Sequence, residues 1–438
     1  MSRRVVITGI GVLSPIGIGN DAYWEALFQG KTGFRSISLF DTSNLKVHIA
    51  GEISDFDPVI FLGKKGLRSL DRSTLLINSA AKLAIEDAHL HITDGKNILQ
   101  SNAKDRENNP PFSKGGLGGF YEQNSHSVGV SIGTTFGSLH SISQFDREGL
   151  IEGPRYVNPS HFPNTVINSP ASQVSIRFKI KGFNTTISTG FCASLDAVMY
   201  ASDFIKLNRA EVVLAGGVEE LCEETFLGFY KLGCLSGTNS SEPTCCPFDA
   251  RRNGVILSEG AAILVLEDEE NALERGAEIL GVVKGYGNAF DPSANKNFNH
   301  AGVGLRNAIT LALQDSSLTP KDIDYISASA NSTKGLDRME TKAIKDIFAE
   351  HASNIPVSSI KSMVGESFSA SGALSMAAAV GAIKKGLIPP TVNCRERDPE
   401  CDLDYVPNEA RQKNINNVLV MSSDPYGQNS AVVIGKYD

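Results

Sequence analysis

The sequence predicts an α/β protein in which buried strands alternate with helices in packed layers. Three observations indicate this class: short β-branched runs that end in glycine, apolar residues at helical spacing between them, and a length of 438 residues. A chain of that length suits several packed layers or lobes better than one compact core. With 41% hydrophobic and 21% charged residues, the composition is that of an ordinary globular protein and excludes global disorder.

The predicted strands are short runs of β-branched and other apolar residues, which is typical of strands that are buried on both faces. They lie at residues 5–8, 128–132, 212–214 and 418–421.

Helices are predicted between these runs. In residues 73–89, Leu75, Ile77, Ala80 and Leu83 recur at spacings close to the 3.6-residue period of a helix. Residues 341–348 and 373–384 are also predicted to be helical.

Two pairs of segments indicate an internal repeat. Residues 5–11 (VVITGIG) resemble 279–287 (ILGVVKGYG), and residues 212–217 (VVLAGG) resemble 418–423 (VLVMSS), as expected if two halves share one topology. A polar segment rich in Gly, Pro and Asn, 96–126, is expected to be a surface insertion with little fixed structure.

Charge and residue spacing exclude several classes of protein. The net charge is −8 and no run of Lys and Arg supplies the basic footprint of nucleic-acid binding. The seven cysteines include no C-x-x-C pair and the eight histidines are scattered, so no metal site is expected. With no signal-like segment and no apolar stretch of about 18–20 residues, we expect a cytoplasmic protein without a membrane span.

Two glycine-rich turns fall short of nucleotide-binding motifs. Gly9-x-Gly11 follows a predicted strand, but Ser14 stands where a dinucleotide fingerprint needs its third glycine. Residues 133–138 (GTTFGS) lack the G-K-[ST] ending of a phosphate-binding loop. The sequence therefore gives no reason to expect a nucleotide cofactor.

A series of ordered motifs carries a family resemblance. They are RRVVITGIGVLSPIG at the start, SLDRSTLLINSAAKLAIEDA (69–88), VVLAGGVEE (212–220), PFDARRNGVILSEGAAILVLEDEENALERGA (247–277), METKAIKDIF (339–348), PVSSIKSMVGE (356–366), and the run from IPPTVN to DPECDLDYVPNEAR (388–411). In these motifs the chain resembles the β-ketoacyl-acyl carrier protein synthases, over nearly its whole length except residues 96–126.

The resemblance implies a thiolase-like five-layer αβαβα fold of two similar halves, expected here at residues 1–277 and 278–438. It also implies a dimer that performs Claisen condensation of an acyl thioester with malonyl carried on acyl carrier protein. No cofactor of the chain's own is expected, because phosphopantetheine arrives on the acyl carrier protein.

The family's nucleophile is a cysteine at a strand-to-helix elbow, where the helix dipole lowers the thiol pKa. The elbow here runs STGFCASLDA from residue 188 to 197, and an ungapped alignment places Phe191 at the nucleophile position. Cys192 comes one residue later. A helical step turns its side chain by about 100°, so we expect Cys192 to be a small buried hydrophobe.

The family's other catalytic positions also differ. Ser329 stands where the first histidine belongs, and Glu366 stands where the second belongs. A carboxylate at Glu366 would repel the enolate that the histidines stabilise. Pro425, which has no N–H, replaces the residue whose amide completes the oxyanion hole. The comparison with the family therefore implies that the Cys-His-His set is absent, and ordinary condensation is not expected.

Several charged residues still match the family pattern. Lys361, Asp337 and Glu340 correspond to its buried charged network, and Asp249 and Glu259 keep the second-half signature. We interpret these charges as structural, because buried charges need partners whether or not catalysis occurs.

Three functions remain open at this point. The first is a non-catalytic subunit that resembles a chain-length factor and pairs with an active ketosynthase homologue, or with itself; typical chain-length factors carry Gln where this chain has Phe191. Its expected interface segments are 134–145 and 164–174. The second is a thioesterase or acyltransferase with Cys192 as nucleophile and Glu366 as base. The third is a carrier-protein scaffold. A malonyl decarboxylase is disfavoured because both histidine positions are changed.

Overall fold

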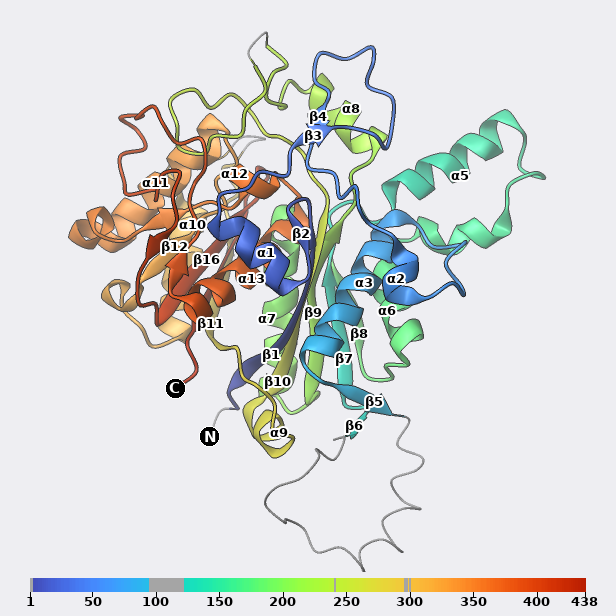
Figure 1. Ribbon diagram of the computed structural model, residues 1–438, viewed down its shortest axis with the longest axis horizontal. Helices are drawn as coiled ribbons and strands as arrows, with labels where there is room; N and C mark the ends of the chain where they lie inside the picture. The colour runs from blue at the N-terminus through green and yellow to red at the C-terminus, as the bar shows by residue number, and fades with distance from the viewer. Residues whose placement is uncertain (1–2, 94–121, 240–241, 295–297, 299–300) are drawn as a thin grey trace, which may run out of the picture.

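The structure, a computed structural model, describes residues 3–93, 122–239, 242–294, 298 and 301–438 (Figure 1). Its main sheet is mixed and runs through the whole molecule. In spatial order the strands are β13 (Val357–Ser358), β12 (Tyr325–Ser327), β16 (Asn417–Ser423), β17 (Gln428–Gly435), β11 (Gly281–Phe290), β1 (Val5–Ser14), β10 (Gly260–Asp268), β9 (Val212–Glu219), β7 (Val128–Gly133) and β8 (Asn184–Ile187), with β2 (Gly17–Ile18) paired to β1.

The sheet consists of two arms with the same strand pattern. From the central β1–β11 pair outward, each arm has two antiparallel pairings followed by two parallel ones. Strands β1 and β11 occupy equivalent places in the two arms, and so do β9 and β16. These are the strands that contain the repeated segments, so the internal repeat is confirmed. The predicted boundary between the two halves, 277/278, falls just before β11. The division of the chain into two halves at this point stays a prediction.

Helices form three layers around the two arms, which gives the five-layer αβαβα arrangement expected from the resemblance (Figure 1). Helices α7 (Ala193–Lys206) and α13 (Ser369–Lys385) pack against each other in the middle layer and touch strands of both arms. On the outer faces, α3 (Arg72–Asp87) and α6 (Ser169–Phe178) cover one arm, while α10 (Val303–Asp315) and α11 (Lys334–Phe348) cover the other.

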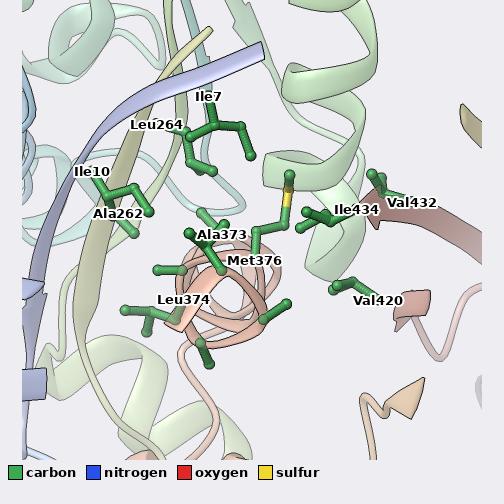
Figure 2. Close-up of a cluster of buried hydrophobic side chains, with 14 of the residues drawn as sticks. Ile7, Ile10, Ala262, Leu264, Ala373, Leu374, Met376, Val420, Val432 and Ile434 are labelled. Atoms are coloured by element: carbon green, nitrogen blue, oxygen red, sulfur yellow. The ribbon is translucent and has the colours of Figure 1, made fainter. Parts of the chain in front are cut away.

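The core of the molecule is centred on α13. In Figure 2, its residues Ala373, Leu374 and Met376 lie among Ile7, Ile10, Ala262 and Leu264 of one arm and Val420, Val432 and Ile434 of the other. The helix is buried along its length until the last turn. A helix that is apolar on all sides belongs inside a large protein, and here it fixes both arms to one core.

The remaining elements are short or peripheral. The helices are α1 (Asn20–Phe28), α2 (Pro58–Leu62), α5 (Leu139–Ile151), α8 (Glu223–Lys231), α9 (Glu269–Glu274) and α12 (Lys361–Val364), with 3₁₀ turns η1 (Pro159–Thr165), η2 (Gly190–Cys192), η3 (Pro320–Asp322) and η4 (Ala349–Ser353). Three further strand pairs are β3 (Arg35–Ser36) with β4 (Ile49–Ala50), β5 (His91–Thr93) with β6 (Glu122–Asn124), and β14 (Leu387–Ile388) with β15 (Arg411–Gln412).

The predicted strands and helices are confirmed, and most are longer than predicted. The glycines of β1 have a packing role: a Cβ on Gly11 would lie 2.0 Å from the Ala80 carbonyl oxygen, and one on Gly9 would lie 2.6 Å from that of Ala84. They let α3 approach the strand closely.

Most of the predicted insertion, residues 96–121, lies outside the described residues. The prediction of little fixed structure is wrong for 122–126, because β6 pairs with β5 there. Gln123 is buried and its Nε2 donates to the Glu211 carboxylate at 2.6 Å, which holds this end of the segment against the body.

The described ranges contain neither a membrane-spanning helix nor a metal-binding cluster. Every helix in them is too short or too polar to cross a bilayer. No group of three or more His, Cys, Asp or Glu side chains in them is placed to hold a metal ion.

Candidate active site

The elbow between β8 and α7 is formed by η2 and depends on Gly190. This glycine has φ +62°, and a Cβ there would lie 2.2 Å from Oδ2 of Asp424. Both the positive φ and the close approach of a carboxylate favour glycine. The elbow thereby brings the backbone of Phe191 up to the turn between β16 and β17.

The Phe191 side chain lies in an aromatic cluster with Phe136, Phe229 and Phe368. Its ring is 6% exposed and meets Phe368 edge-on, with 5.0 Å between the ring centroids. The Phe136 and Phe229 rings lie 5.2 and 5.1 Å from the same Phe368 ring. Such edge-to-face pairs are favourable beyond their buried area. The position predicted for the nucleophile therefore holds a packed phenyl ring.

Phe368 has an unusual backbone, with φ +47° and ψ −117° at the start of α13. A positive φ is rare for a bulky residue and costs roughly 1–3 kcal/mol. Burial of the ring in the aromatic cluster and a 3.0 Å hydrogen bond from its N–H to Glu366 Oε1 hold it there.

The Phe191 N–H donates to Asp424 Oδ2 at 3.2 Å. The other carboxyl oxygen of Asp424 accepts from the Tyr426 N–H at 2.7 Å, across Pro425. Burial raises the pKa of Asp424 above its usual value. At the nucleophile position the amide that would face an oxyanion is thus occupied by the chain's own carboxyl group, and the neighbouring Pro425 has no N–H to offer.

The Cys192 thiol contacts the end of the same turn. It is fully buried, and its Sγ donates to the Gln428 carbonyl oxygen at 3.4 Å. Burial, with the carboxylates of Asp196 and Asp424 adding to it, raises the pKa of the Cys192 thiol well above its usual range. The thiol is therefore protonated at neutral pH, whereas a nucleophilic cysteine needs the thiolate.

Glu366 and Lys361 form a buried ion pair, with Nζ 2.8 Å from Oε2. The Glu366 carboxylate also accepts from Asn331 Nδ2 at 2.8 Å and Ser371 Oγ at 3.0 Å, besides the Phe368 N–H. Lys361 Nζ donates in addition to Ser329 Oγ at 3.2 Å. We call Lys361, Glu366, Ser329 and Asn331 the charged centre; it gathers two of the four altered positions, Ser329 and Glu366, around one ammonium group.

Asp337 and Glu340, which the resemblance groups with Lys361, each accept a hydrogen bond from the backbone N–H of a residue in the charged centre. Asp337 accepts from the Phe248 and Asn331 N–H groups, and Arg252 Nε lies 3.6 Å from its Oδ2. Burial raises its pKa to about 6. Glu340 accepts from the Ser329 N–H at 2.8 Å, and burial raises its pKa to about 8. Glu340 is therefore mainly neutral at pH 7.

Asp249 and Glu259 each bind an arginine and anchor a loop. Arg251 forms a two-pronged pair with Asp249 at 2.8 and 2.9 Å, and hydrogen bonds to Asp249 lower its pKa to about 2 despite burial. Arg72 forms a similar pair with Glu259, both contacts at 2.6 Å. We interpret the Arg251–Asp249 and Arg72–Glu259 pairs as structural contacts that hold the loops around the site.

Two groups near the site were missed from sequence. Asp424 precedes Pro425 and gave no signal, because its contact with Phe191 spans 233 residues of sequence. Glu219, within VVLAGGVEE, accepts from the Thr135 and Phe136 N–H groups, and burial raises its pKa to about 7. The signal that could have identified Glu219 is an acidic residue at the end of a predicted buried strand.

The chain is similar to known proteins over nearly its whole length. Family profiles described as the β-ketoacyl synthase N-terminal and C-terminal domains match residues 2–102 with 116–272 and residues 280–395. A 3-oxoacyl-[acyl-carrier-protein] synthase 2 of Coxiella burnetii is 34% identical over 99% of both chains. The tetracenomycin polyketide synthase ketoacyl synthase alpha subunit of Streptomyces glaucescens is 36% identical over 99% of this chain and 97% of that one.

Solved structures give the same result. The ishigamide ketosynthase/chain length factor superposes with a TM-score of 0.86 at 32% identity, over 100% of both chains. A type II polyketide synthase acyl-carrier protein in complex with its ketosynthase bound to the hexaketide gives 0.85 at 29% identity, also over 100% of both. With these matches and a thiolase-like fold, the chain belongs to the β-ketoacyl synthase family of fatty acid and polyketide synthesis.

Proposed function

We propose that this chain is a non-catalytic subunit of the chain-length-factor type, which associates with an active ketosynthase homologue and receives no acyl group itself. One of the similar solved structures is named as a ketosynthase/chain length factor, which is the pairing we have in mind.

The observation that carries the proposal is the filled elbow. The Phe191 ring packs on Phe368 where an acyl thioester would need space, and its N–H is bound to Asp424. Condensation needs a nucleophile and at least two free donors for the oxyanion at that point. The Phe191 ring is not a nucleophile. The Phe191 N–H is already bound to Asp424 and Pro425 has no N–H, so neither can donate to an oxyanion.

The charged centre supports the same conclusion. Decarboxylation of a malonyl group develops negative charge on an enolate, which needs hydrogen-bond donors. Glu366 accepts four hydrogen bonds, and the Lys361 ammonium is already bound to Glu366 and Ser329. An enolate placed here would meet a carboxylate whose charge is already balanced by that ammonium.

The surface supports a partner subunit. The hairpin from α5 to η1 stands away from the body of the molecule (Figure 1), and Leu150, Ile151, Tyr156 and Phe162 on it are 86%, 71%, 74% and 59% exposed. The two interface segments expected from sequence overlap its ends. Strand β8 ends the main sheet in the same arm. Exposed large apolar side chains and an open sheet edge are both typical of surfaces that a partner covers.

Intact-protein mass spectrometry tests the absence of catalysis. The purified chain, incubated with acyl- and malonyl-acyl carrier protein beside an active ketosynthase, should gain no acyl mass while the active enzyme does. Cys192→Ala and the half-buried Cys234→Ala serve as a matched pair. A stoichiometric adduct that is lost in Cys192→Ala and kept in Cys234→Ala would establish the thioesterase or acyltransferase alternative.

Co-expression with ketosynthases of its own genome, followed by sizing, tests the partner. We expect a stable complex that is lost in the double variant Leu150→Glu/Ile151→Glu and kept in Leu232→Glu, which changes another exposed leucine, on the surface after α8. A monomer in the presence of every homologue would contradict the proposal.

A further inference from the structure

A cavity of about 260 Å³ lies outside the elbow and the charged centre, between the chain around Phe248 and the loop of residues 394–407. An engineered apolar cavity of roughly 150 Å³ is large enough to hold benzene. The cavity here therefore has room for a molecule somewhat larger than one aromatic ring.

Its wall includes a rigid aromatic pair. Phe248 and Tyr405 stack with 3.9 Å between ring centroids and 11° between ring planes, and both are buried. The Phe248 N–H is bound to Asp337 at 2.8 Å, and the Tyr405 hydroxyl lies 2.8 Å from Thr341 Oγ1. Leu403 and Pro407 add apolar surface to the cavity. This side of the wall is therefore preformed and largely apolar, so little ordering would be needed when a ligand binds.

The acidic side chains on the wall lie beside arginines that are not part of it. Asp404 pairs with Arg411, and Glu396 lies 3.5 Å from Arg251, which also pairs with Asp249. The two remaining charged wall residues are Arg395 and Arg397, and within the described parts of the chain neither side chain forms an ion pair.

The backbone that carries these arginines is fixed at Asp249. Its Oδ2 accepts from the N–H groups of Arg395 and Glu396 at 2.6 and 2.7 Å, and Asp249 forms a β-bridge with Arg397. Guanidinium groups on a fixed backbone suit a planar carboxylate, which they can bind with two parallel hydrogen bonds.

We propose that this cavity is a binding site for a small aromatic carboxylate, with the ring system against the apolar side of the wall at Leu403 and Pro407 and the carboxylate on Arg395 and Arg397. The site is separate from the elbow, so it does not depend on whether the chain is catalytic.

Isothermal titration calorimetry of the full chain with 2-naphthoate tests the proposal. We expect saturable binding that weakens about tenfold or more in Arg395→Gln/Arg397→Gln and with the neutral isostere 2-naphthamide, because each change removes the charged hydrogen bonds. Arg68→Gln, which removes an exposed arginine between α2 and α3, should bind like wild type. Leu403→Trp, which fills the cavity, should abolish binding.

Thermal melts check that each variant is folded; the arginine variants change exposed side chains and should melt like wild type. The proposal is overturned if wild type shows no saturable binding, if 2-naphthamide binds as well as 2-naphthoate, or if folded Arg395→Gln/Arg397→Gln binds like Arg68→Gln. Should Leu403→Trp not fold, the arginine pair and the amide isostere still decide the question.

Discussion

The elbow around Phe191 and the charged centre around Lys361 are filled in opposite ways. At the elbow, four phenyl rings pack together and one buried carboxyl group accepts the backbone N–H. At the charged centre, a buried ammonium and a buried carboxylate satisfy each other with the help of neighbouring polar groups. Phe368 belongs to both, with its ring in the aromatic cluster and its N–H on Glu366.

This difference indicates how strongly a substitution in each region should lower the stability of the protein. Apolar packing loses contacts roughly in proportion to the volume that is removed. A buried ion pair depends on both partners at once, because removing one leaves the other charged and unpaired in a medium of low dielectric constant. The charged centre should therefore be the more sensitive region to a single substitution.

The largest effect is expected for Lys361→Met. Glu366 would be left without its counter-ion, and we expect the free energy of unfolding to fall by about 3–5 kcal/mol in urea denaturation. The matched control is Lys384→Met, whose exposed pair with Glu278 should contribute less than about 1 kcal/mol. Adding Glu366→Gln to Lys361→Met should recover part of the loss. Equal losses in the two lysine variants would contradict the comparison.

Phe191→Cys is expected to cost about 2–4 kcal/mol, because it opens a cavity in the aromatic cluster. It should not restore condensation, since Ser329, Glu366 and Pro425 are unchanged and still lack the donors that the reaction needs. Phe290→Cys, at a phenylalanine that is 61% exposed, is the control and should change stability by no more than about 0.5 kcal/mol. A wild-type melt for Phe191→Cys, or any measurable condensation, would show that this account of the elbow is wrong.

Stability should fall as the pH rises from about 4.5 to about 8. Burial raises the pKa of Glu340 and Glu220 to about 8 and that of Glu219 to about 7, so the folded chain keeps protons that the unfolded chain has released. Stability therefore decreases with pH across this window. Glu340→Gln removes one such proton and should make the loss smaller by up to about 4 kcal/mol, unlike Glu350→Gln at an exposed site. Parallel pH profiles for wild type and Glu340→Gln would disprove the assignment.

The smallest effect is expected at Asp424. Asp424→Asn keeps an oxygen acceptor for one of the two N–H groups, whereas Asp424→Ala leaves both the Phe191 and Tyr426 N–H groups without their partner. We expect Asp424→Ala to be less stable than Asp424→Asn by about 1 kcal/mol in chemical denaturation. Identical stabilities would mean that water satisfies the Phe191 amide and that the elbow is more open than its packing indicates.

Most of the fold could be predicted from local patterns and the family resemblance. The buried strands β1, β7, β9 and β16 were visible as β-branched runs, because a strand buried on both faces tolerates little else. The start of α13 was missed: residues 369–372 read SASG, a poor helix-forming run. There Ser369 Oγ lies 2.8 Å from the Val218 carbonyl oxygen, a contact that no local pattern reveals.

The sequence by itself determined which chemical groups stand at the family's catalytic positions: a phenyl ring, a hydroxyl, a carboxyl and a proline. Only the tertiary structure decided what those groups do. It joined Glu366 to Lys361, bound the Phe191 amide to Asp424 across 233 residues, and turned the thiol of Cys192 toward a backbone carbonyl. The physical reason is that residue patterns report periodicity and burial along one segment, whereas hydrogen bonds and ion pairs depend on distances between segments that only packing sets.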